Sequence, residues 1–238
     1  MMELQKTADQ YNTQLEKQSI VEKLKFLAEQ HPGKVVFTTS FGYEDQAITD
    51  LIFDNDIDIK VITLDTGRLF PETYKVFRST VERYKKEIQV YFPPADKVEE
   101  MVTKKGPFSF YESLENRKEC CFIRKVIPLK RALAGNDIWI TGLRAAQSDN
   151  RSDMKEFEVD EGNNIVKFNP LKGWSLDETI AYIKEKRIPY NVLHDKGFVS
   201  IGCQPCTRAI QPGEDFRAGR WWWEQGTGKE CGLHEVKK

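Results

Sequence analysis

The chain has 238 residues, with 36 lysines and arginines against 37 aspartates and glutamates, and its formal net charge is -1. This balance, with 39% hydrophobic and 31% charged residues, is typical of a globular protein and provides no basic surface for nucleic acid. No apolar run is long enough to span a membrane and the first residues do not resemble a signal peptide. We therefore expect a cytoplasmic protein that binds neither membranes nor nucleic acid.

The first part of the chain alternates between predicted helices and predicted strands. Apolar residues from Ile20 to Ala28 recur at helical spacing, and the pattern stops at His31-Pro32-Gly33. Short apolar runs, typical of buried parallel strands, then alternate with helical patterns. In chain order we predict a strand at 35–37, a helix at 45–53, a strand at 60–64, a helix at 71–85, a strand at 88–91, a helix from about 120 to 134 and a strand at 137–141. This order predicts an α/β fold with a doubly wound, mainly parallel sheet.

The rest of the chain is less regular. A polar stretch at 142–153 precedes a predicted hairpin at 156–168, which turns at 161–164, and a predicted helix at 176–186. The last segment contains five glycines. We therefore predict one α/β domain at 1–210, which binds the ligands, followed by a mobile C-terminal arm at 211–238.

Polar loops follow three of the predicted strands, and in an open α/β sheet ligands bind at the carboxyl ends of the strands. Ser40 and Gly42 open a helix and can present backbone N–H groups to an anion, although an ordinary strand-to-helix turn has the same composition. The loop at 64–70 follows the second strand, and the loop at 142–151 carries Arg144 and Arg151. Arginines on loops at one sheet edge suit a phosphate or a sulfate, and solvated surface arginines are the alternative.

The five cysteines form two pairs and a single residue. Cys120 and Cys121 are adjacent, Cys203 and Cys206 form a C-x-x-C pair, and Cys231 stands apart. Clustered cysteines in a reducing compartment indicate metal or redox chemistry. A zinc site usually combines two C-x-x-C pairs, whereas adjacent cysteines reach separate iron corners of a 4Fe–4S cube with less strain. We therefore predict one 4Fe–4S cluster per chain, with zinc or buried structural cysteines as alternatives, and the fifth cysteine is left for chemistry.

Together these segments resemble the assimilatory sulfonucleotide reductases, specifically the iron–sulfur type called adenylyl-sulfate (APS) reductase. The resemblance runs from Val35 to His234 and depends on motifs in a fixed order. These are Ser40-Phe41-Gly42-Tyr43-Glu44-Asp45, Leu64-Asp65-Thr66-Gly67-Arg68, Cys120-Cys121 with Arg124-Lys125, Gly142-Leu143-Arg144 with Arg151, the segment 189–208, Arg217-x-Gly219-Arg220-Trp221-Trp222-Trp223, and Glu230-Cys231-Gly232-Leu233-His234. Tyr43 and Glu44-Asp45-Gln46 depart from the family theme in the first motif.

The resemblance implies an adenine nucleotide alpha hydrolase-like fold with a modified PP-loop. It implies that Cys231 attacks the sulfur of adenosine 5′-phosphosulfate (APS), expels AMP and becomes an S-sulfocysteine, from which thioredoxin or a similar dithiol protein releases sulfite. The cluster ligands would be Cys120, Cys121, Cys203 and Cys206. The substrate would be bound by Ser40, Gly42, Asp65, Gly67, Lys125, Arg144, Arg151, Arg217, Arg220 and His234. We also expect a homo-oligomer, and a role in sulfate assimilation and cysteine biosynthesis.

We also expect particular roles for the cluster and for the tryptophans. The cluster would fix a helix that begins near Cys120 and would position Lys125 beside the substrate. The tryptophans at 221–223 would form a hydrophobic seam that packs the arm onto the body, or a docking face for the dithiol protein.

Three other functions compete with this interpretation. A reductase of 3′-phosphoadenosine 5′-phosphosulfate (PAPS), or a dual-specificity enzyme, would keep the C-terminal motif, but such relatives usually lack the paired cysteines. An ATP pyrophosphatase acting on tRNA would need a basic surface, which the net charge of -1 does not favour. A non-enzymatic metal sensor would leave Cys231 and the arginines unexplained.

Overall fold

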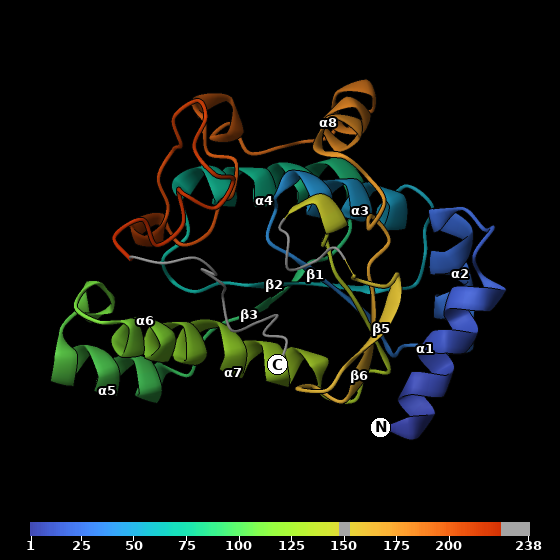
Figure 1. The fold of residues 1–238 in the computed structure, drawn as a ribbon, viewed down its shortest axis with the longest axis horizontal. Helices are drawn as coiled ribbons and strands as arrows, with labels where there is room; N and C mark the ends of the chain where they lie inside the picture. Colours follow the sequence, from blue (N-terminus) through green and yellow to red (C-terminus); the bar gives the residue numbers. More distant parts are fainter. Residues whose placement is uncertain (148–152, 225–238) are drawn as a thin grey trace. The chain divides into compact units, whose positions relative to one another are not determined.

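The computed structural model describes residues 1–147 and 153–224 (Figure 1). Within these residues the sheet has six strands in the order β3-β2-β1-β4-β6-β5. The strands are β1 (Val35–Thr39), β2 (Lys60–Leu64), β3 (Gln89–Tyr91), β4 (Ile138–Ile140), β5 (Phe157–Asp160) and β6 (Ile165–Phe168). β1 pairs in parallel with β2 and β4, β4 pairs in parallel with β6, and β5 and β6 form an antiparallel pair. The predicted α/β fold with a mainly parallel sheet is confirmed.

The strand order places a switch point between β1 and β4. The chain passes from β1 outward to β2 and β3, and then returns to the other side of β1 for β4 and β6. In the register of the two central strands, Phe37 lies opposite Ile140. The loops that follow β1 and β4 therefore leave the sheet at neighbouring positions, where open α/β sheets bind their ligands.

The described helices include the predicted ones and also helices that the sequence did not predict. They are α1 (Met2–Gln14), α2 (Ile20–Gln30), α3 (Tyr43–Phe53), α4 (Pro71–Tyr84), α5 (Ala95–Lys105), α6 (Leu114–Cys121), α7 (Ile127–Leu133) and α8 (Leu176–Glu185). α1 and α5 were not predicted because their apolar stripes are sparse: α1 buries only Ala8 and Tyr11, and α5 only Met101. Short helices lie at η1 (Ser109–Tyr111), η2 (Phe122–Val126), η3 (Ala145–Gln147), η5 (His194–Lys196) and η6 (Gln204–Cys206).

The helix predicted to begin near Cys120 is wrong in its start. Cys120 and Cys121 lie instead at the end of α6, and the π-helix η2 and then α7 follow without a break. Ser113 caps α6, because its side chain accepts a hydrogen bond from the backbone N–H of Asn116. The helix therefore starts where a hydroxyl accepts a hydrogen bond from one of its first N–H groups, and Cys120 and Cys121 are its last two residues.

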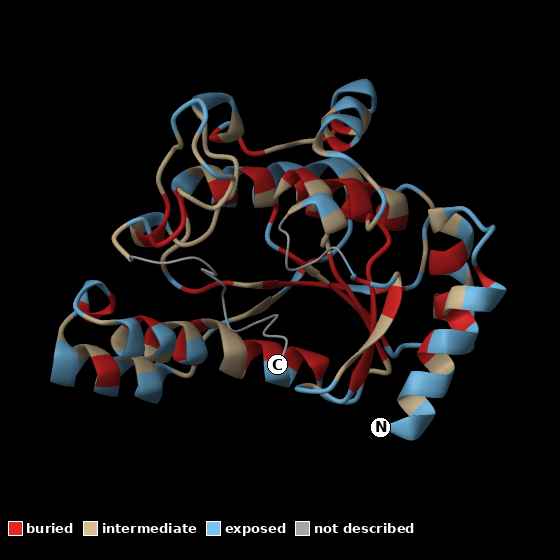
Figure 2. Cartoon of the chain, in the orientation of Figure 1, coloured by how far each residue is buried: buried red, intermediate tan, exposed pale blue. Residues whose placement is uncertain are grey.

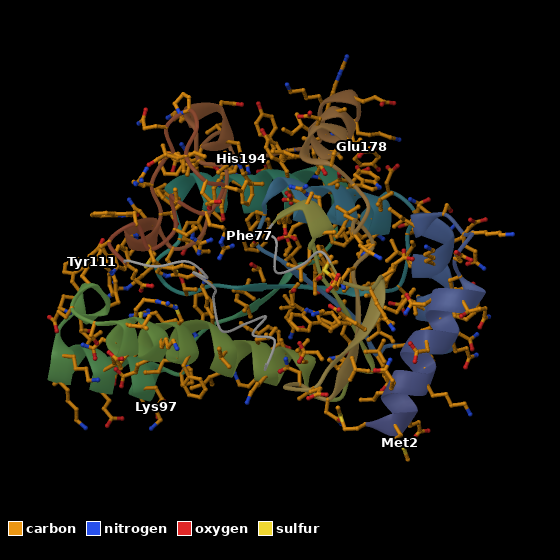
Figure 3. The ribbon with its side chains drawn as sticks, in the orientation of Figure 1. Met2, Phe77, Lys97, Tyr111, Glu178 and His194 are labelled. Carbon is orange, nitrogen blue, oxygen red and sulfur yellow. The ribbon has the colours of Figure 1, made fainter. Side chains whose placement is uncertain are left out.

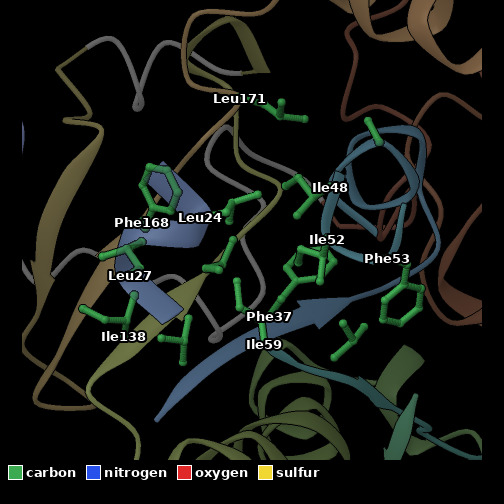
Figure 4. Packing of buried hydrophobic residues seen from close by; sticks show 14 of the residues in the cluster. Leu24, Leu27, Phe37, Ile48, Ile52, Phe53, Ile59, Ile138, Phe168 and Leu171 are labelled. Carbon is green, nitrogen blue, oxygen red and sulfur yellow. The ribbon is translucent and has the colours of Figure 1, made fainter. Parts of the chain in front are cut away.

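The chain divides into two compact units. Unit 1 comprises Met1–Thr63, Lys75–Gln89 and Leu133–Asn191, and unit 2 comprises Leu64–Tyr74, Val90–Ala132 and the chain from Val192. The main core lies in unit 1, where Leu24 and Leu27 of α2 and Ile48 and Ile52 of α3 are buried with Phe37 of the sheet (Figures 2 and 4). Every residue of β4 and β6 is buried, which is typical of parallel strands.

Unit 2 has a smaller core that includes two of the paired cysteines. Its buried members are Met101, Phe110, Cys120, Ile123, Cys206 and Trp221. Residues 211–224, which the sequence assigned to the C-terminal arm, belong to this unit. Among residues 1–147 and 153–224, no helix is both long enough and apolar enough to cross a membrane.

Candidate functional site

The loop after β1 is closed by a buried carboxylate. Asp45 Oδ2 accepts hydrogen bonds from the Ser40 backbone N–H (2.5 Å) and from Ser40 Oγ (2.7 Å). Phe41, the residue after Ser40 in this loop, has a φ of 62°. Its buried ring stacks on Phe77 with 5.0 Å between ring centroids. Burial raises the pKa of Asp45 to about 6, although the hydrogen bonds from Ser40 act in the opposite direction. The Ser40 donors that were expected to face an anion are thus engaged by this chain's own side chain.

The loop after β4 fits against the same carboxylate. A Cβ atom on Gly142 would lie 2.1 Å from Asp45 Oδ1, so the close approach of these segments requires glycine. Arg144 is buried, and its Nε donates a 2.8 Å hydrogen bond to Glu44 Oε1, which also accepts from Gln147 Nε2 at 3.1 Å. Unit 1 therefore brings Ser40, Gly42 and Arg144 together at the switch point, with Glu44 and Asp45 as partners that the sequence did not predict.

The loop after β2 is part of unit 2 and holds a second buried carboxylate. Asp65 Oδ1 accepts hydrogen bonds from the Gly67 backbone N–H (2.8 Å) and from Tyr74 Oη (3.0 Å). Gly67 has a φ of 70°, in the left-handed region that favours glycine. Burial, and then the hydrogen bond to Asp65, raise the pKa of Tyr74 to about 12. The two residues predicted for this loop therefore shape its turn.

The four paired cysteines line one pocket in unit 2. Cys120 and Cys121 come from the end of α6, Cys203 directly precedes η6, and Cys206 is the last residue of η6. The other lining residues are Arg68, Phe110, Arg117, Arg124 and Lys125. In the part of the chain that the structure describes, no three Cys, His, Asp or Glu side chains are grouped to hold a single metal ion. The donor set is four soft sulfur ligands beside several cations, which is the chemistry that an iron–sulfur cluster uses.

Charge in this pocket is unbalanced. Burial raises the pKa of Cys120, and the positive charge of Arg124 opposes this shift. Burial also raises the pKa of Cys206 to about 12, and here the opposing charge is that of Lys125. Arg124 is buried and donates from Nη1 to the Thr66 carbonyl at 2.7 Å, but its buried Nε has no hydrogen-bond partner among the described residues. Neutral thiols do not compensate the positive charge of buried cations beside them. A bound group that converts the thiols to thiolates would supply the missing negative charge.

Further contacts tie neighbouring elements to the cysteines. Thr66 Oγ1 lies 3.3 Å from Cys203 Sγ and accepts the Arg68 backbone N–H at 3.2 Å, and its hydroxyl can donate to the sulfur when Cys203 is a thiolate. The π-helix η2 directly follows Cys121 and supplies Arg124 and Lys125 to the pocket. Single π-helical turns are rare and are found most often at functional sites.

The segment after Gly219 packs on this pocket. Trp221 is 1% exposed, and its backbone N–H donates to the Cys206 carbonyl at 3.1 Å. The guanidinium carbons of Arg117, Arg217 and Arg220 lie 4.7, 5.6 and 4.7 Å from its ring centroid, within cation–π range. Arg220 also donates from Nη1 to Ser200 Oγ at 3.2 Å. Unit 2 thus brings the predicted Arg217 and Arg220 onto one tryptophan beside the cysteines.

The tryptophans divide between two environments. Tyr111 is labelled in Figure 3. Trp223 packs edge-on against Tyr111, with ring centroids 4.4 Å apart, and the Tyr111 hydroxyl donates to the Pro205 carbonyl at 2.6 Å. Trp222 remains 48% exposed. The seam interpretation therefore describes Trp221 and Trp223, which attach their segment to the body of unit 2.

The sequence-predicted residues fall into three groups. Ser40, Gly42 and Arg144 lie in unit 1; Asp65, Gly67, Lys125, Arg217, Arg220 and the four paired cysteines lie in unit 2. Arg151, Cys231 and His234 lie outside the described residues. The sequence did not single out Thr66, Arg117 and Glu224, whose partners lie far away along the chain.

Comparisons with known proteins agree on one family. A family model described as the phosphoadenosine phosphosulfate reductase domain matches residues 34–209. An adenosine 5′-phosphosulfate reductase from Agrobacterium fabrum is 50% identical over 202 residues, which cover 85% of this chain and 78% of the relative. Another from Sinorhizobium fredii (strain USDA 257) is 47% identical over 231 residues, covering 97% of this chain and 92% of the relative.

Solved structures support the same fold. A phosphoadenylyl-sulfate (PAPS) reductase from Candida auris, determined as a phosphate complex, is 31% identical with a TM-score of 0.74, covering 87% of this chain and 97% of the other. An FMN adenylyltransferase from Candida glabrata, crystallised with FMN and an ATP analogue, is 14% identical with a TM-score of 0.52, covering 87% of this chain and 75% of the other. At that identity the second likeness concerns the fold alone.

Proposed function

This chain belongs to the phosphoadenosine phosphosulfate reductase family, and we propose that within it the chain reduces adenosine 5′-phosphosulfate (APS) to sulfite and AMP. The observation that carries the proposal is the pocket lined by all four paired cysteines and by four cationic side chains. Relatives named adenosine 5′-phosphosulfate reductase, 46–50% identical to this chain, support the same assignment.

The cysteine pocket suits a 4Fe–4S cluster, held by Cys120, Cys121, Cys203 and Cys206. When bound, the cluster would supply the positive charge that keeps its thiolate ligands ionised, which burial opposes at Cys120 and Cys206. The buried Arg124 Nε, which has no protein acceptor among the described residues, and the Thr66 hydroxyl would then have sulfur acceptors. The donor set therefore fits this group.

Reduction would proceed through Cys231. Its thiolate attacks the sulfate sulfur, the bond from that sulfur to the bridging phosphate oxygen breaks, and AMP leaves with the electron pair. Arg217, Arg220 and Lys125 are cations that can stabilise the negative charge of the transferring sulfuryl group. One thiol of a dithiol protein of the thioredoxin kind then attacks Cys231 Sγ and releases sulfite. Its second thiol resolves the mixed disulfide, so the two electrons come from the partner.

A single-turnover experiment tests this route. Protein incubated with APS and no reductant is expected to gain one SO₃ unit on the peptide that contains Cys231, as measured by mass spectrometry. Cys231→Ser should keep its iron and still bind AMP, yet form no adduct and no sulfite, because a hydroxyl is a far weaker nucleophile than a thiolate. An adduct on another residue, or turnover by the serine variant, would show that the assigned nucleophile is wrong.

The same assay separates the two nucleotides. We expect a higher kcat/KM with APS than with PAPS, because the motif residues include no further cation assigned to a second phosphate. Equal or reversed values would make the chain a dual-specificity enzyme or a PAPS reductase, as the solved relative from Candida auris is named.

A further inference from the structure

Arg117 is a buried cation in unit 2 with an unusual set of partners. It lies in α6, one turn before Cys120, and its side chain is 5% exposed. Its Nε lies 2.7 Å from Glu224 Oε1 and its Nη2 lies 3.0 Å from Glu224 Oε2, so the guanidinium and the carboxylate meet in a two-bonded pair. Arg117 also lines the cysteine pocket together with Cys121.

The aromatic segment fixes both partners of this pair. The Arg117 guanidinium lies over the ring of Trp221, 4.7 Å from its centroid, and the Glu224 backbone N–H donates to the Trp221 carbonyl at 2.9 Å. Arg117 precedes Cys121 by four residues in α6, so the two side chains share one face of the helix, and both line the cysteine pocket. The guanidinium therefore has the Glu224 carboxylate as its partner and lies on the same helix face as Cys121.

Anchoring alone does not require this arrangement. A buried ion pair is costly to desolvate, and apolar side chains of similar size often hold two segments together at least as well. A guanidinium has five N–H donors, and two of them reach Glu224. Donors directed to cysteine sulfurs change the electronic properties of an iron–sulfur centre, which an apolar contact does not do.

We propose that Arg117 is a positioning residue of the cysteine pocket: it delivers an N–H group and positive charge to the Cys121 sulfur, while Glu224 orients the guanidinium and moderates its charge. The inference rests on the proposed cluster at Cys120, Cys121, Cys203 and Cys206. It assigns opposite electronic effects to the two partners of one ion pair. An anchor would give them the same effect.

Resonance Raman spectra of the iron-loaded protein test this assignment through the Fe–S(Cys) stretching bands. A hydrogen bond to a coordinated sulfur withdraws electron density from the iron–sulfur bond and lowers its stretching frequency. Arg117→Met should therefore move a cysteine band to higher frequency. Glu224→Gln keeps the shape of the side chain but removes its charge, so it should move the band to lower frequency. Arg78→Met, which removes an exposed ion pair with Glu82 in unit 1, is the control and should leave the spectrum unchanged.

Folding failure must be separated from electronic tuning. Arg117→Met leaves a buried carboxylate without its partner, so the double variant Arg117→Met/Glu224→Gln is measured beside it. We expect the double variant to recover iron content and to keep the higher-frequency band. If neither variant without Arg117 holds iron, the Glu224→Gln spectrum alone tests the proposal: a shift of the cysteine band to lower frequency supports it, and any other result contradicts it.

The possible outcomes distinguish this inference from the proposed cluster. Wild-type protein prepared without air and lacking iron would remove the cluster, and the inference with it. Iron-loaded wild type together with an unshifted band in both single variants would overturn the role of Arg117 alone. Shifts in the same direction in both variants would reduce the ion pair to an anchor and would equally overturn the proposal.

Discussion

The loop site of unit 1 and the cysteine pocket of unit 2 handle buried charge in opposite ways. At the switch point the two carboxylates have partners from this chain: Asp45 accepts from Ser40, and Glu44 accepts from Arg144. In the cysteine pocket the Arg124 Nε has no protein acceptor among the described residues, and the buried thiols favour their neutral form. The first site is organised by its own side chains, whereas the second is balanced only when a ligand of suitable charge is present.

This difference predicts how the two regions respond to substitution. Removing one ligand from the cysteine pocket removes the group that balances its charge, so the effect should be close to complete. Removing one contact from the switch point leaves the other pairs in place, so the effect should be graded.

Replacement of one cluster cysteine should give the largest effect. Cys203→Ser is expected to lose most of its iron and about 100-fold or more of its activity, because serine is a poor ligand for iron and the remaining thiols are left beside unbalanced cations. Iron analysis and sulfite release on anaerobically prepared protein measure both losses. Cys231→Ser is the matched control, since it should lose activity and keep its iron. Full iron content in Cys203→Ser would show that the pocket does not depend on that thiolate.

Gly142→Ala should give an intermediate effect. The added Cβ would lie 2.1 Å from Asp45 Oδ1 and 3.3 Å from the Glu44 Cβ, so the loop after β4 or the start of α3 must shift. We expect destabilisation of about 1–3 kcal/mol, typical of an overpacked site, and weaker AMP binding. Urea denaturation and calorimetric titration with AMP measure these changes. Gly173→Ala is the control in the same unit, because its added Cβ would have no atom within 4 Å. Equal behaviour of the two variants would contradict the packing described at the switch point.

Some features of the switch point and of the cysteine pocket can be predicted from the sequence, and others cannot. β2 and the cysteine pairs were predicted because their signals are local: a short apolar run, and sulfur ligands at a recognisable spacing. The Arg117–Glu224 pair was not predictable, because its partners lie far apart in the chain and a lone Arg or Glu is usually a solvated surface residue. Glu44 and Asp45 were noticed only as departures from a family motif. Their importance becomes visible once the order β1-β4 places Gly142 and Arg144 against them.

The position of Cys120 and Cys121 at the end of α6 could not be predicted for a related reason. Local helical spacing does not distinguish a helix that begins at Cys120 from one that ends there. The choice depends on the Ser113 cap and on the π-helical residues that bring Arg124 and Lys125 to the pocket. The four paired cysteines do line one pocket, but they end a helix and do not begin one as the sequence predicted.

The smallest predicted effect is the pH dependence of stability that Asp45 confers. Burial raises the native pKa of this carboxyl from 3.8 to about 6, so the native state favours the protonated form relative to the unfolded chain. The contribution is therefore favourable below the unfolded pKa and is progressively lost as the pH rises through about 6. Asparagine does not ionise, so Asp45→Asn should gain about 1 kcal/mol relative to wild type between pH 5 and pH 7.

Urea denaturation at a series of pH values measures that difference, and Glu29→Gln serves as the control for loss of an exposed carboxylate. Asparagine also gives up one acceptor for the Ser40 donors, but this loss is independent of pH and offsets the whole curve without changing its slope. A constant difference between wild type and Asp45→Asn from pH 5 to pH 7 would contradict the prediction. It would mean that the Ser40 hydrogen bonds stabilise the charged carboxylate as strongly as burial disfavours it, and the switch point would then be a site already suited to holding an anion.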